Sequence, residues 1–201
     1  MFYYLDGMIS YIGQNLAVVD INGAGYACSC TTNTLSYLET GKKAKLYTYC
    51  NIKEDAFDIY GFYTEQEKRS FEMLISVSGV GPKAALSILS FASPEQLAVA
   101  IIDENDKLLT AAPGIGKRTA QRIILELKDK IAKENITFSK DDSFVPVQSG
   151  VGKGSKINDA SSALAVLGFG QAEISALLRG IDTESLTVEQ IVKEALKNSM
   201  K

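Results

Sequence analysis

The stretch that decides the fold is a motif that occurs twice, GVGPKAALSIL at residues 79–89 and GIGKRTAQRII at residues 114–124. The copies align without gaps at a spacing of 35 residues, which marks an internal repeat. In each copy a Gly-aliphatic-Gly turn is followed by a basic residue, an alanine and an aliphatic pair. Apolar residues at helical spacing precede each turn. The sequence therefore predicts two helical hairpins, each bent at a glycine turn.

The chemistry of these turns suits phosphate. Glycine reaches backbone angles barred to other residues and lets a ligand approach the backbone closely. Each turn opens into a helix, whose free N–H groups and positive dipole end form an anion site. No acidic residue lies at positions 73–94 or 107–125, and several basic ones do. We predict phosphate contacts, which position DNA without reading its sequence, at Gly79, Val80, Gly81, Lys83, Gly114, Ile115, Gly116, Lys117, Arg118 and Arg122.

Two other known glycine motifs must be considered as interpretations of these glycines. A dinucleotide fingerprint would also fit Gly79-x-Gly81-x-x-Ala84, but it needs a preceding strand, and the predicted flanks are helical. A Walker A sequence is absent because the Gly-Lys pairs at 116–117 and 152–153 are followed by Arg118 and Gly154. We therefore expect no ATP hydrolysis by this chain itself.

Composition narrows the function further. The net charge of −3 and the pI near 5.1 argue against a protein that coats nucleic acid by bulk charge, so a DNA contact must be local. The chain has no histidine, and its cysteines, Cys28, Cys30 and Cys50, lack CxxC spacing. We expect no metal or other cofactor, and cysteines packed in strands. No apolar run approaches the ~20 residues that cross a bilayer, which predicts a cytoplasmic protein with no membrane contact.

The spacing of the hydrophobic residues along the chain divides it into four segments. A β domain comes first, and the structured segments after it are all-α. Residues 1–62 read as five short strands with a helical turn at 33–38, as in an OB-fold barrel that ends in an acidic hairpin. Residues 63–138 form the tandem helix-hairpin-helix domain, which a capping box of Thr64 and Glu67 would open. Residues 139–158 are rich in Ser, Gly and Lys and read as a flexible linker. Residues 159–201 predict a three-helix bundle of the ubiquitin-associated (UBA) type, with a capping box of Thr187 and Gln190.

This order of elements closely resembles the RuvA family, the Holliday-junction-binding subunits of bacterial branch-migration complexes. The resemblance covers essentially the whole chain. Its most specific parts are EDA at 54–56 before YGF at 60–62, GVGPK at 79–83, PGIGK at 113–117 and the tail motif ALxxLGF at 163–169. It implies a non-catalytic role in DNA recombination and repair.

The resemblance also implies partners. The chain would form a homotetramer, or an octamer on DNA, that holds a four-way junction open and planar. Glu54 and Asp55 match an acidic pin that keeps strands apart at the junction centre. The RuvB hexameric ATPase would dock on the tail and supply the force, and the RuvC resolvase is a further candidate partner. The expected docking residues are Leu164, Leu167, Phe169, Leu177 and Leu178. The chain departs from the family in Lys53, where an arginine is frequent, which leaves phosphate contact there open.

Two alternatives remain. A nuclease or glycosylase could hold DNA with the same hairpins while Glu54, Asp55 and Asp58 bind Mg²⁺. Adjacent side chains on a strand diverge, however, and no third acid is placed by the sequence to close a metal cage. The tail could instead be a general peptide-binding module of the UBA type.

Overall fold

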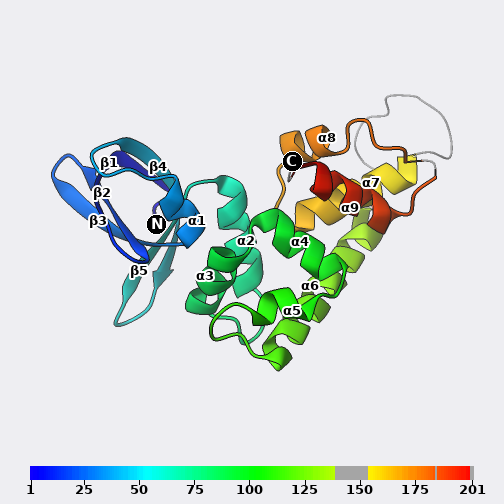
Figure 1. The fold of residues 1–201 in the computed structure, drawn as a ribbon, viewed down its shortest axis with the longest axis horizontal. Coiled ribbons are helices and arrows are strands. Elements are labelled where there is room, and N and C mark those ends of the chain that lie inside the picture. Colours follow the sequence, from blue (N-terminus) through cyan, green and yellow to red (C-terminus); the bar gives the residue numbers. More distant parts are fainter. Residues whose placement is uncertain (139–153, 184, 200–201) are drawn as a thin grey trace.

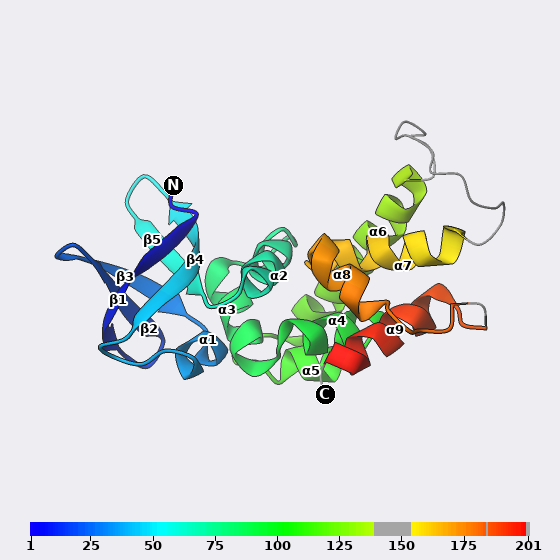
Figure 2. The same cartoon turned by 90° about the horizontal axis from the view of Figure 1, so that it is seen from above.

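The computed structural model describes residues 1–138, 154–183 and 185–199. The barrel lies at one end of the molecule, the hairpin helices lie in the middle, and the last three helices pack beyond them (Figure 1). Figure 2, turned by 90°, shows the same succession of barrel, hairpins and tail.

The N-terminal unit is a five-stranded closed barrel in the order β1-β2-β3-β5-β4. Its elements are β1 (Tyr4–Ile12), β2 (Leu16–Ile21), β3 (Ala24–Cys30), α1 (Thr32–Ser36), β4 (Lys43–Ile52) and β5 (Phe57–Phe62). Along β1 alternate residues Leu5, Gly7 and Ile9 are buried, which is the two-residue period of a strand with one face in a core. The short helix between β3 and β4, and the parallel pairing of β3 with β5, agree with the predicted OB-like barrel.

The middle region is helical, as predicted. It consists of α2 (Glu65–Ile75), α3 (Pro82–Phe91), α4 (Pro94–Ile102), α5 (Asp106–Thr110) and α6 (Lys117–Phe138). A capping box of Ser93 and Gln96, which was not predicted from the sequence, begins α4. No single helix in the described part of the chain is long and apolar enough to span a membrane; α3 and α4 would pass that test only together, and they meet at a 97° bend.

The tail forms three helices, α7 (Gly154–Val166), α8 (Gln171–Leu177) and α9 (Val188–Ser199). The Thr187 and Gln190 capping box is present at α9, with both hydrogen bonds made. Helix α7 begins at Gly154, inside the segment predicted as linker, and the rest of that segment, 139–153, lies outside the described residues. The buried tail residues belong to one core with those of the hairpins, and Lys193 on α9 binds Asp103 at 2.8 Å.

A buried carboxylate joins the barrel to the hairpins. Glu67 on α2 is 1% exposed and accepts hydrogen bonds from the hydroxyls of Thr31 (2.5 Å) and Thr34 (2.6 Å). Thr64 caps α2 by accepting from the Glu67 backbone N–H at 3.1 Å, but the predicted return bond from the Glu67 side chain is replaced by the two threonines. That half of the capping-box prediction was wrong, because buried hydroxyl donors on the barrel compete for the carboxylate. Burial raises the pKa of Glu67, and the hydroxyls oppose this effect.

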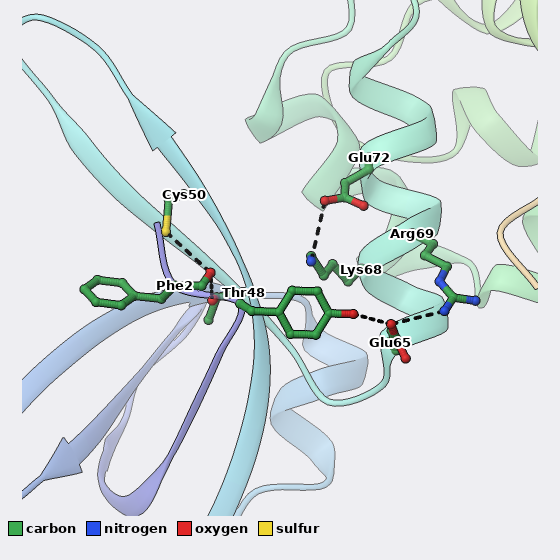
Figure 3. A network of polar contacts seen from close by, with 8 residues as sticks. Phe2, Thr48, Cys50, Glu65, Lys68, Arg69 and Glu72 are labelled. Carbon is green, nitrogen blue, oxygen red and sulfur yellow. Dashed lines mark hydrogen bonds and ion pairs between the residues drawn. The ribbon is translucent and has the colours of Figure 1, made fainter. Parts of the chain in front are cut away.

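A second set of contacts joins Tyr3, which directly precedes β1, to the same helix (Figure 3). The Tyr3 hydroxyl donates to Glu65, which also pairs with Arg69 at 3.1 Å. The ammonium of Lys68 lies 4.1 Å from the centre of the Tyr3 ring and 3.7 Å from Glu72. Together with Glu67, these contacts fix the direction in which the hairpins leave the barrel.

Candidate nucleic-acid interface

The two glycine turns have the same local geometry. Gly79 and Gly114 both have φ of +84°, in the left-handed region that favours glycine. In each turn the next residue, Val80 or Ile115, is buried and its N–H donates three residues back, to Val77 or Ala112. The aliphatic residue of each turn is thus packed into the hairpin core. The match extends along the following helices, where the paired residues Ala85 and Ala120, Ile88 and Ile123, and Leu89 and Ile124 are all buried.

The second glycine of each turn faces open space. Gly81 caps α3 with an extended backbone (φ −89°, ψ 170°), and its carbonyl accepts from Ala85 at 3.0 Å. Gly116 makes the same bond to Ala120 at 3.0 Å. A Cβ added at either position would meet no protein atom within 4 Å. The two helix N-termini are therefore accessible to an anion, and the first-turn N–H groups supply its donors.

Exposed cations flank both turns. Within the described residues, the side chains of Lys83, Lys117 and Arg118 make no ion pair, and all three residues are exposed. Arg122 is 56% exposed in its side chain and lies 3.8 Å from Glu126. The predicted cations therefore gather beside the open helix ends, where a phosphate would meet both N–H groups and positive charge.

Two reciprocal hydrogen bonds lock the hairpins together. The Ser87 hydroxyl on α3 donates to the carbonyl of Pro113 in the second loop at 2.8 Å, and Arg122 on α6 donates to the carbonyl of Ser78 in the first loop at 3.4 Å. The spacing of 35 residues relates Ser87 to Arg122 and Ser78 to Pro113, so the two bonds are equivalent in the repeat. Glu126 adds a third tie by accepting from the Ser78 N–H at 3.2 Å. Neither Ser87 nor Glu126 was predicted from the sequence, although comparing each repeat position with its equivalent would have singled out Ser87.

The predicted acidic pin is a tight turn between β4 and β5. The N–H of Lys53 donates to the carbonyl of Ala56 at 2.8 Å, which leaves Glu54 and Asp55 exposed at the tip. In Figure 1 this turn and the loop between α5 and α6 both reach the lower side of the molecule. Asp58, the third acid of the nuclease alternative, accepts from the amide of Asn51 at 3.3 Å.

The described residues include no group of three Asp, Glu, Cys or His side chains placed to hold a metal ion. Cys28, Cys30 and Cys50 are free and buried in strands, as expected. Burial raises the pKa of the Cys28 thiol to about 12 and also raises that of Cys30. Both thiols therefore stay protonated near neutral pH and are poor nucleophiles.

The predicted docking residues of the tail lie mostly inside the structure. Leu164, Leu167 and Phe169 are at most 5% exposed, while Leu177 and Leu178 are half-buried. A partner that meets the tail in this arrangement reaches the last two leucines and not the first three.

The fold and the site define a class. A small closed barrel precedes two glycine-hinged helical hairpins with open helix N-termini and exposed cations beside them, as expected of DNA-binding proteins of the helix-hairpin-helix type. Sequence-family comparison agrees: residues 71–129 match the SAM-like helix-hairpin-helix tandem. Residues 1–61 match the RuvA N-terminal domain, and residues 155–200 match the RuvA C-terminal domain. The chain belongs to the RuvA family.

Full-length relatives support this assignment. The chain is 44% identical to a protein of Acetivibrio thermocellus, with 98% of each chain covered. It is 46% identical to a protein of Thermoanaerobacter sp. strain X514, with both chains covered completely, and 42% identical to a protein of Ruminiclostridium cellulolyticum. Each of these relatives is named Holliday junction branch migration complex subunit RuvA.

Proposed function

We propose that this protein binds four-way DNA junctions through phosphate contacts at its two hairpin turns and serves as the non-catalytic subunit of a branch-migration complex. The observation that carries the proposal is the pair of equivalent turns with open second glycines, each beside exposed cations. Family membership and the names of the full-length relatives support the choice of a junction as the substrate.

Phosphate contacts explain why the interface needs no base-reading side chain. A junction that migrates presents a changing sequence to the protein, so contacts must be independent of base identity. The acidic tip formed by Glu54 and Asp55 would repel the backbones that cross at the junction centre and favour strand separation. Several subunits must surround the junction for the tips to meet there, so a four-fold homotetramer, or two on opposite faces as an octamer, is part of the proposal.

The tail is proposed to dock the RuvB ATPase. The half-buried Leu177 and Leu178 are the accessible part of the predicted docking set. They lie on the same segment as exposed Arg179, so an apolar contact with a charged rim is available there. The RuvC resolvase remains a candidate for a separate contact.

The direct test incubates the pure protein with a synthetic four-way junction and Mg²⁺, without any partner, and analyses native and denaturing gels. A retarded complex with intact strands supports binding without catalysis. Cut strands would support the nuclease alternative, in which Glu54, Asp55 and Asp58 bind the metal. Light scattering with and without junction DNA gives the mass of the assembly and distinguishes a tetramer from an octamer.

A further inference from the structure

A groove of about 680 Å³ separates the barrel from the first hairpin, and neither the turns nor the acidic tip accounts for it. Residues from the barrel and from α3 line it, and Pro113 of the second hairpin loop also contributes. The lining residues that matter here are Asn15, Asp58, Lys83, Ser87, Phe91 and Pro113. The groove therefore runs from the phosphate-binding turns to the strand that leaves the acidic tip.

Three of the lining residues indicate where the groove runs. Pro113 immediately precedes the second glycine turn, and Lys83 lies in the first turn of α3 beside Gly81. At the other side, Asp58 lies near the start of β5, three residues after Asp55 in the turn at the acidic tip. A DNA strand held at the turns and separated at the tip would pass along this groove.

The lining carries the three chemical groups that a nucleotide uses. Lys83 supplies a cation for phosphate, and Asn15 and Asp58 supply hydrogen-bonding groups for a base edge. Phe91 is 57% exposed at the end of α3, which leaves a large flat apolar ring available for stacking. Bases of any identity stack on aromatic rings, so such a site tolerates a moving sequence.

We propose that this groove holds a single unpaired nucleotide of the strand that passes from the hairpin turns to the acidic tip, with its base stacked on Phe91. The inference rests on the proposed function, since it needs a junction held at the turns. A volume of about 680 Å³ falls in the range of about 300–1,000 Å³ of small-ligand sites. Holding one opened base there would lower the cost of unpairing, which is a few kcal/mol for a base taken out of a duplex.

The test compares two junctions that differ in a single base. One carries an extra thymidine at the crossover, and the other carries an abasic nucleotide at the same place. Stacking on an aromatic side chain contributes about 1–3 kcal/mol per base, or about 5- to 150-fold in affinity. The wild-type protein should bind the thymidine junction at least about fivefold more tightly than the abasic junction. Phe91→Ala should bind both equally, and Phe91→Tyr should keep the preference.

Phe57→Ala is the matched control. Phe57 is a phenylalanine of similar exposure, 54%, that packs near Phe2 on the barrel outside the groove, so its removal should leave the preference unchanged. Equal wild-type affinity for the two junctions would overturn the nucleotide site while leaving junction binding intact. Failure of the wild type to bind either junction would refute the proposed function instead. A changed mass of Phe91→Ala in light scattering would place Phe91 in an interface between copies, which also overturns the assignment.

Discussion

Replacing both Gly81 and Gly116 with alanine should weaken the proposed phosphate contacts without harming the fold. Neither residue has a φ in the left-handed region, and an added Cβ would meet nothing within 4 Å at either position. Alanine in place of glycine at a compatible backbone reduces the entropy of the unfolded chain. The free energy of unfolding should therefore stay constant or rise by about 0.4–1 kcal/mol per site.

Binding should change in the opposite direction. Each methyl group occupies the space in front of a helix N-terminus, where a phosphate oxygen would accept its hydrogen bonds. A hydrogen bond to a charged group contributes about 1.5–3 kcal/mol, so the removal of each such bond should weaken binding by about 10- to 150-fold. We expect this effect in titrations of a labelled four-way junction, and by the same factor for two junctions of unrelated sequence.

The first glycines of the turns give the contrasting control. Gly79 and Gly114 have φ of +84°, where an L side chain costs roughly 1–2 kcal/mol. Alanine at either position should lower the Tm by about 2–8 °C, measured by calorimetry. If the variant with alanine at Gly81 and Gly116 folds and still binds like the wild type, the turns do not hold phosphate. A weakening that depends on junction sequence would equally refute backbone recognition.

Four further predictions concern the proposed binding site, the tail and the contact of Glu67 between the barrel and the hairpins. Lys117→Ala and Arg118→Ala should each reduce the slope of log affinity against log salt by about 0.9 for every phosphate that is no longer neutralised, while Lys42→Ala, an exposed lysine of the barrel, should not change it. Glu54→Gln with Asp55→Asn should keep or tighten junction binding while altering strand separation, and weaker binding at low salt would contradict the repulsive role of the tip. Deleting residues 159–201 should spare junction binding but abolish stimulation of the partner ATPase, so persistent stimulation would exclude the tail as its docking site. Glu67→Gln should cost roughly 1–3 kcal/mol, because Thr31 and Thr34 donate to different oxygens of the carboxylate, and in glutamine one of these oxygens becomes an NH2 group that cannot accept. Burial raises the folded-state pKa of Glu67 above its ordinary value of 4.5, so the free energy of unfolding of the wild type should fall as pH rises from about that value toward the raised pKa. Denaturant titrations across this range should show a smaller pH dependence in the variant.

The fold was predictable because its determinants are local. Glycine turns, strand alternation and the cap at Thr187 each follow from residues a few positions apart, and the structure has all of them. The family motifs then indicated the order of the barrel, the hairpins and the tail along the chain. The open space at Gly81 was also implicit in the motif, because two glycines in one turn are needed only if both a left-handed backbone and a close approach are required.

The features that the sequence could not predict depend on contacts between residues that are far apart in the chain. The capping prediction failed at Glu67 because the competing donors, Thr31 and Thr34, are more than 30 residues away. The apolar pattern of the tail likewise predicted a bundle but not that Leu164 and Leu167 would join the core of the hairpins. Periodicity identifies which side chains are buried, whereas only the tertiary structure shows what covers them.

The two reciprocal hydrogen bonds between the hairpins hold the two turns at a fixed position relative to each other. If each hairpin moved independently, binding both to one DNA arm would require ordering them at a cost in entropy. Ser87 and Arg122 instead hold each loop against the helix of the other repeat before DNA arrives. The bond to Ser78 uses one N–H of the Arg122 guanidinium, which has five, and the side chain stays 56% exposed, so donors beyond those that face Ser78 and Glu126 remain for other partners. The distance between the two proposed phosphate sites is thus set by the folded protein before any complex forms, and such preorganisation would let contacts without sequence information still select the shape of a junction arm.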